Sequence, residues 1–100
     1  MLFAVLFEDA PDAPADLRQR HMRAHLDFLA AHAQQIHAAG PLNGEGPQGG
    51  LWLVEAEDAE AVRALTRADP FWPTGLRQSV RICAWRQVFA EGRALIDPPA

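Results

Sequence analysis

Hydrophobic residues fall in short runs separated by loops rich in proline, glycine and acidic residues, and these runs predict the secondary structure. Residues 2–7, LFAVLF, are apolar at both odd and even positions, which predicts a strand covered on both faces. Residues 50–56 predict a second strand of the same kind, and residues 76–89, LRQSVRICAWRQVF, predict the last one. A further short strand is expected within residues 36–42.

Two segments have the spacing of amphipathic helices. Residues 14–38 follow a Pro/Asp loop in which Asp12 or Asp16 is expected to cap the helix. Apolar residues repeat along it at i, i+4 and i+7, and this stripe consists of Met22, Leu26, Leu29, Ala33 and Ile36. Asp58 is expected to cap a second helix, whose apolar side consists of Ala61, Val62, Leu65 and Ala68. The sequence DPFWPTG ends that helix because its prolines and glycine prevent regular structure.

The order of these elements, βαββαβ, is the ferredoxin-like pattern. We predict an α+β domain with a four-stranded antiparallel sheet and two helices on one face. The strands nevertheless carry apolar side chains, including Phe3, Trp52 and Trp85, on both parities. A second copy of the chain is the economical cover for the other face, which predicts a homodimer packed sheet against sheet. Residues 1–90 form the predicted domain, and residues 91–100 a loose C-terminal tail.

Composition narrows the classes of function. One hundred residues support one domain, and 49% hydrophobic with 22% charged residues is typical of a globular protein. The net charge is −4, and the nine basic residues, all arginines, form no stripe, which disfavours nucleic acid and anionic membranes as partners. Cys83 is the single cysteine, which excludes an internal disulfide and fits a reducing compartment. The first apolar run is too short to span a membrane, so we expect a cytoplasmic protein.

Histidines are the first candidates for chemistry. His21, His25 and His32 line one edge of the first helix, with His25 nearest to the apolar stripe. His21 and His25 have the i, i+4 spacing of two metal ligands, but neither a HExxH glutamate nor a cysteine pair accompanies them, so no metal site is predicted. Two interpretations stay open: a polar flank that forms local hydrogen bonds, or a general acid–base group, since histidine titrates near neutral pH.

Asp69 is the second candidate, in the segment ADPFW at the end of the second helix. Pro70 forces an extended backbone at Asp69, and Phe71 and Trp72 could wall a pocket. A carboxylate beside apolar walls can orient a histidine and stabilise its charged form. The alternative is an aspartate that bonds its own backbone in a turn.

Three segments together resemble the YCII-related family over about residues 1–87: RQRHMRAHLDFLAAH, AAGPLNGEGPQGGLWLVEAEDAEAVRALTRADPFWPTGL and VRICAWRQ. The features that carry the resemblance are the helical histidine in HLDFL, then AGPL, ADPF and a late tryptophan, in that order. The family implies a ferredoxin-like fold whose sheets pair face to face, as a dimeric α+β barrel. It also implies an active site built on a histidine and an aspartate, which fall on His25 and Asp69. Either Arg20 or Arg23 adds a positive charge, and we assign Arg23 to the pocket with Phe71 and Trp72.

The resemblance implies a small cofactor-free enzyme of the lyase or isomerase type. One branch is similar to chlorinated-hydroquinone dehydrochlorinases, in which such a pair removes a proton as halide leaves. His25 is then the general base, oriented by Asp69, and the substrate is a small aromatic or carbonyl compound. Two alternatives remain: a non-catalytic binding or accessory module that uses the same pocket, and a cofactor-independent oxygenase of the same superfamily. The expected partners are a second copy and a small-molecule ligand, without cofactor, metal, nucleic acid or membrane.

Overall fold

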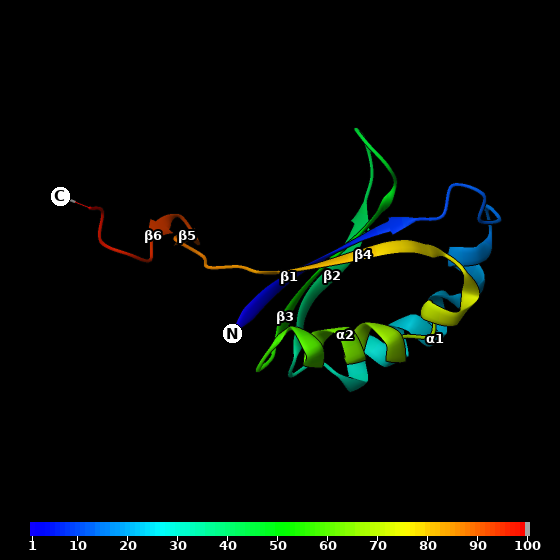
Figure 1. Cartoon of the computed structure of the whole chain (residues 1–100), viewed down its shortest axis with the longest axis horizontal. Coiled ribbons are helices and arrows are strands. Elements are labelled where there is room, and N and C mark those ends of the chain that lie inside the picture. Colours follow the sequence, from blue (N-terminus) through cyan, green and yellow to red (C-terminus); the bar gives the residue numbers. More distant parts are fainter. Residues whose placement is uncertain (100) are drawn as a thin grey trace.

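The computed structural model describes residues 1–99, and its order of elements confirms the βαββαβ prediction. Strands β1 (Leu2–Asp9), β2 (Ile36–Leu42), β3 (Gly49–Glu55) and β4 (Arg77–Ala84) form an antiparallel sheet in the order β2-β3-β1-β4. Helices α1 (Leu17–Ala31) and α2 (Ala59–Ala68) both lie on one side of this sheet (Figure 1). The chain therefore has the ferredoxin-like α+β fold.

Alternate side chains of the strands form the core between the sheet and the helices. The register pairs Val5 with Trp52, and both are almost completely buried. The buried core residues of the strands and of α2 are Phe3, Val5, Phe7, Ile36, Trp52, Val54, Val62 and Leu65. Side chains of the other parity, such as Leu6 and the paired Leu51, are only half-buried. The two apolar parities of β1 and β3 thus correspond to a core face and an open face.

The first helix is shorter than predicted. It ends at Ala31 rather than at residue 38, and a turn leads directly into β2 at Ile36. The Asp16 side chain makes no capping hydrogen bond and instead pairs with Arg20, with Nε and Oδ2 3.3 Å apart. Ile36 is therefore a buried strand residue, as the expected short strand requires, and is not part of the helical stripe.

The predicted apolar stripe of α1 was wrong at Leu26 and Ala33, whereas Met22 and Leu29 do pack, half-buried, against the core. Leu26 is 52% exposed, whereas Leu17 and His25 are the buried residues of this helix. Phe28 packs partly buried against the core. The helix is rotated toward the side that carries the histidines because Phe28 and His25 supply flat rings that pack beside Trp52. The histidine edge thus faces the core, and Met22, Leu26 and Leu29 lie on its flank.

The second helix begins as predicted and ends in a tight turn. Asp58 Oδ1 accepts a hydrogen bond from the Ala61 N–H at 2.9 Å, which confirms the cap. Asp69 follows the helix with φ −65° and ψ 133°, the extended conformation expected before proline. A 3₁₀ turn, η1 (Trp72–Thr74), comes next, and Gly75 at φ 86° redirects the chain into β4.

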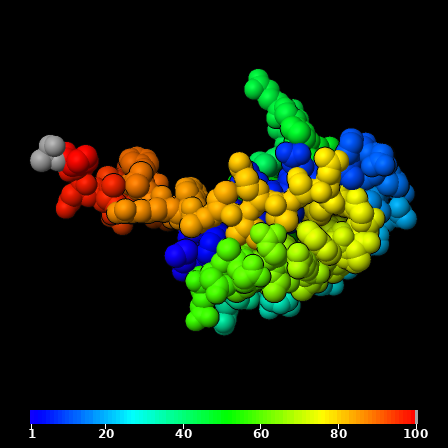
Figure 2. All heavy atoms as spheres, in the orientation of Figure 1, coloured from blue at the N-terminus to red at the C-terminus, as the bar shows by residue number. Residues whose placement is uncertain are grey.

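The C-terminal region differs from the prediction. β4 ends at Ala84 rather than at residue 89, and the short strands β5 (Phe89–Ala90) and β6 (Arg93–Ala94) pair with each other outside the main sheet. Figure 2 shows this arm, in orange and red, projecting from the body of the domain. The hairpin spans residues 89–94, and Ala100 lies outside the described residues. Residues 1–99 contain no helix that is long and apolar enough to cross a membrane.

Candidate active site

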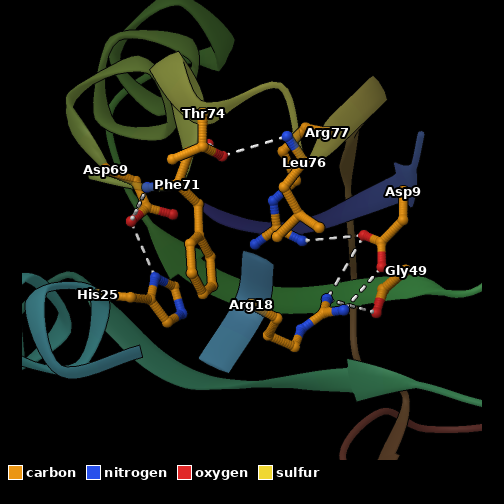
Figure 3. Close-up of polar contacts among 9 residues, drawn as sticks. All are labelled: Asp9, Arg18, His25, Gly49, Asp69, Phe71, Thr74, Leu76 and Arg77. Atoms are coloured by element: carbon orange, nitrogen blue, oxygen red, sulfur yellow. Dashed lines mark hydrogen bonds and ion pairs between the residues drawn. The ribbon is translucent and has the colours of Figure 1, made fainter. Parts of the chain in front are cut away.

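His25 and Asp69 meet inside the domain, although 44 positions separate them in the chain. His25 Nδ1 lies 2.8 Å from Asp69 Oδ1 (Figure 3), and the two residues are 7% and 2% exposed. The imidazole also stacks on the buried ring of Phe71, with centroids 4.1 Å apart and an angle of 19° between the planes. The contact expected from the sequence is therefore present, and apolar surroundings enclose it.

The turn after α2 fixes the Asp69 carboxylate. Its Oδ1, which contacts the histidine, also accepts a hydrogen bond from the Phe71 N–H at 3.2 Å. The interpretation of Asp69 as a turn residue and its interpretation as a partner of His25 are thus both correct, and one oxygen serves both contacts. Thr74 holds the same turn, since its hydroxyl donates to the Phe71 carbonyl at 2.7 Å and accepts from the Leu76 N–H at 3.1 Å.

This arrangement sets the hydrogen positions on the imidazole. An ionised carboxylate only accepts hydrogen bonds, so Nδ1 of His25 carries the hydrogen toward Asp69. In the neutral ring, Nε2 then has a free lone pair. Figure 3 shows Nε2 on the side of the ring that points away from Asp69. A neutral His25 can therefore take up a proton at Nε2 while Asp69 stabilises the resulting charge.

His25 lines a cavity of about 130 Å³ between α1 and the sheet. An engineered cavity of about 150 Å³ in another protein holds benzene, so this volume suits a molecule built on a single ring. Its walls are Arg18, Met22, His25, Leu26, Leu29, Ala39, Gly40, Pro41, Gly50, Trp52, Phe71 and Arg77. A separate hollow of about 310 Å³, near the loop after β1, shares Arg18 with this cavity but contains neither His25 nor Asp69.

The other residues predicted for the site are placed differently. Phe71 lines the cavity, whereas Trp72, half-buried in η1, does not. Arg23 is exposed and also absent from the walls, because it lies on the outer side of α1 once the histidine edge faces the core. Two arginines that the sequence did not single out, Arg18 and Arg77, take this position.

The remaining histidines and the cysteine stay outside the cavity. His32 Nδ1 lies 2.9 Å from the carbonyl oxygen of Phe28, one turn earlier, which is a local hydrogen bond. His21 is half-buried on α1, and Cys83 is half-buried on β4. Within residues 1–99, no three histidine, cysteine or acidic side chains lie close enough together to hold a metal ion.

Arg18, Arg77 and Asp9 form a charged cluster at one end of the cavity. Arg18 donates from Nη1 to Asp9 Oδ2 at 2.7 Å and also contacts Oδ1 at 3.4 Å. Arg77 Nη1 lies 3.7 Å from Asp9 Oδ1, beyond hydrogen-bond distance, and its guanidinium stacks 4.0 Å above the Phe7 ring. Burial lowers the pKa of Arg77 to about 10, although Asp69 and Asp9 act to raise it, so the side chain stays charged at neutral pH.

Sequence reasoning missed Arg77 because a strand that begins LRQSV looks polar and solvated. One signal was available on β3, which pairs with the other side of β1. Gly50 is paired with Phe7, and a Cβ at Gly50 would lie 3.3 Å from Arg77 Nη1. The glycine thus leaves the space in which the guanidinium lies on the sheet.

Comparison with known proteins agrees with the fold. The family model of the YCII-related domain matches residues 1–86. Among solved structures, the chain is similar to a 5-chloro-2-hydroxyhydroquinone dehydrochlorinase from Burkholderia phenoliruptrix AC1100 in complex with 2,5-dihydroxybenzoquinone. The TM-score is 0.73 at 28% sequence identity, and the match covers 86% of this chain and 94% of that one. No curated protein sequence matches the chain significantly.

Proposed function

Since the chain belongs to the family of YCII-related domains, we propose that it is a cofactor-free enzyme that removes a proton from a small single-ring substrate. The observation that carries this proposal is the buried His25–Asp69 pair, 2.8 Å apart, at the wall of a cavity of about 130 Å³. The pair supplies a base whose tautomer is fixed, and the cavity supplies room for one ring.

The reaction that we propose is an elimination of the dehydrochlorinase type, which the similar solved structure favours as the chemistry of this fold. The substrate would react from a tautomer that carries hydrogen and chlorine on the same ring carbon. Nε2 of His25 takes a hydroxyl proton, and the O–H electron pair forms a carbonyl. The ring double bond shifts, and the C–Cl bond breaks as both electrons leave on chloride. The imidazolium then returns its proton to water, so the net loss is one proton and one chloride ion.

Asp69 would act as the positioning residue for this base. It holds Nδ1–H of His25 and keeps Nε2 free, and its negative charge stabilises the imidazolium formed in the step. Phe71 stacks on the imidazole at 4.1 Å, which limits rotation of the ring. Proton transfer by a side chain positioned in this way accelerates reactions by about 10²- to 10⁴-fold.

The test is chloride release and quinone formation from 5-chloro-2-hydroxyhydroquinone and related chlorinated single-ring hydroquinones. We expect turnover by the natural protein and a loss of about 100-fold or more in kcat for His25→Gln. His32→Gln, at the C-terminal end of the same helix, is the matched control, because its Nδ1 bonds the Phe28 carbonyl and lies outside the cavity. Binding of these compounds without turnover would refute catalysis and favour a binding module. Equal activity of the two variants would refute the role of His25.

We also propose that the chain acts as a homodimer packed through the open face of its sheet. The half-buried apolar side chains of this face support the proposal, and on β1 and β3 they are Leu2, Ala4, Leu6, Leu51 and Leu53. Light scattering should give a dimer at micromolar concentration, and Leu53→Asp should give a monomer. Ala24→Asp, on the exposed side of α1, should leave the dimer intact. A monomeric natural protein would contradict the proposal.

A further inference from the structure

Arg77 is a buried cation whose hydrogen-bonding capacity the fold leaves unused. Its side chain is only 4% exposed, and Nε and Nη1 are both buried without a hydrogen-bond partner among residues 1–99. A buried donor without a partner costs free energy, and a buried charge without one costs more. The structure retains this arrangement at the wall of the cavity that His25 also lines.

The neighbouring carboxylates leave donors of Arg77 without a hydrogen bond. Within residues 1–99, Asp9 is the only carboxylate in ion-pair range of its guanidinium, and Arg18 already contacts both oxygens of Asp9 at 2.7 and 3.4 Å. Asp69 is held by His25 and the Phe71 N–H. Arg18 and Arg77 thus share the carboxylate of Asp9, and Asp69, although its charge raises the pKa of Arg77, makes no ion pair with the guanidinium.

Aromatic rings hold the guanidinium in place. Its central carbon lies 4.0 Å above the Phe7 ring and 5.3 Å from the Phe71 ring. Phe71 therefore contacts the cation as well as His25, and Figure 3 shows its ring between the two. Gly50 leaves room for the guanidinium, since a Cβ there would lie 3.3 Å from Nη1. The cation is pre-oriented in the same cavity as the base.

We propose that Arg77 is the specificity residue of this cavity and that it selects single-ring ligands bearing an anionic oxygen, as a ring carboxylate or as a phenolate or enolate. This inference rests on the proposed function, whose base would act on the ring that Arg77 holds. An anionic oxygen supplies the hydrogen-bond acceptor that the fold lacks, and an arginine bonds such oxygens through more than one N–H. In the proposed elimination, the same cation would stabilise the oxygen that gains negative charge.

Benzoate and benzamide test this proposal because they share size and planarity and differ in charge. Calorimetric titration of the natural protein at fixed ionic strength should show that benzoate binds at least about tenfold more tightly than benzamide. Arg77→Met keeps the apolar stem of the side chain and should bring the two affinities close to equality. Arg67→Met is the matched control, since Arg67 is exposed on α2 and absent from the cavity walls, so it should leave the preference unchanged. A third probe, 4-nitrophenol, separates phenolate from carboxylate recognition through the visible absorbance of its ionised form.

The outcomes separate this inference from the proposed function. His25→Gln should lose turnover yet keep the preference for benzoate. If the natural protein prefers benzoate but shows no turnover, only the enzyme proposal is refuted. The inference is overturned if the natural protein binds benzoate and benzamide equally, or if Arg77→Met keeps the preference, which would make Arg77 a structural cation only. Should Arg77→Met fail to fold, Arg77→Lys is the substitute. It keeps the charge without the planar group and should reduce the preference without abolishing it.

Discussion

Replacement of Asp69 by asparagine tests how the candidate base is held. In the structure, one oxygen of Asp69 accepts both from His25 Nδ1 at 2.8 Å and from the Phe71 N–H at 3.2 Å. Asparagine keeps one carbonyl oxygen and replaces the other oxygen by NH₂. The Phe71 N–H needs an acceptor, so it should hold the amide oxygen at the position of Oδ1. His25 should then keep its hydrogen on Nδ1 in the variant.

The expected loss of activity follows from this geometry. A hydrogen bond to a charged group contributes about 1.5–3 kcal/mol and one between neutral groups about 0.5–1.5 kcal/mol, so the variant forfeits roughly 1–2 kcal/mol at this contact. Each 1.4 kcal/mol corresponds to a factor of ten, which gives a decrease in kcat of about 5- to 30-fold. A switch of the tautomer would cost far more, since the comparable change in a serine protease lowers kcat by about 10⁴-fold.

Two measurements decide the matter. Chloride release from 5-chloro-2-hydroxyhydroquinone gives kcat, and ¹⁵N NMR of the histidine ring identifies the tautomer without any need for turnover. Asp27→Asn is the control, because Asp27 is exposed on α1 and should change neither result. A hydrogen on Nε2 in Asp69→Asn, or a loss near 10⁴-fold, would show that the Phe71 N–H does not fix the side chain as we argue.

Two further predictions concern stability and are measured by chemical denaturation. Gly49→Ala should lower the free energy of unfolding by about 2 kcal/mol or more, because the new Cβ would lie 1.8 Å from the Phe7 carbonyl oxygen. Gly40→Ala is the control with open space around it, and equal stability of the two variants would contradict the argument. Asp58→Ala should lower the free energy of unfolding by about 1 kcal/mol by removing the acceptor of the Ala61 N–H; an unchanged value would mean that the cap is idle.

The strands and their order were predictable from the sequence because their signal is local. An apolar run bounded by turn residues indicates a strand whatever packs on it. The predicted strand, residues 2–7, begins at the same residue as β1 (Leu2–Asp9) and ends shortly before it. The ends were less well predicted where tertiary contacts decide them. The turn after α1 lies within a pattern that also reads as helix, and only pairing of Ile36 with Val54 makes it the start of a strand.

The orientation of α1 could not be predicted from apolar periodicity. Met22, Leu26 and Leu29 form the more hydrophobic stripe, yet Leu26 is 52% exposed and His25 is buried. Ring stacking and a buried hydrogen bond decide the orientation of α1 more than its aliphatic side chains do, since His25 contacts both Asp69 and the face of the Phe71 ring. A side chain that is polar by itself becomes part of the core once its partner is present, and the partner lies 44 residues away.

The arginines of the cavity depend on long-range register, which explains why Arg23 was chosen in place of Arg18 and Arg77. Arg18 is held at the cavity by its ion pair with Asp9, and Arg77 by stacking above the Phe7 ring. Both contacts join segments whose relative placement follows from strand pairing. The family resemblance pointed to Arg20 or Arg23, which are close to His25 in sequence, but Arg23 lies on the exposed side of the helix.

The edge strand β2 has a consequence for how copies of this chain can associate. Its register shifts between Ile36 and Ala38, and Pro41 has no amide hydrogen to offer. A neighbouring sheet would therefore find an interrupted ladder of donors and acceptors along this border and could not extend it regularly. Association through the β2 edge, one route to filaments and to aggregation, is thereby disfavoured. A face-to-face contact buries the open face of both copies, so no further copy can add through that face. The proposed assembly would therefore stop at a dimer.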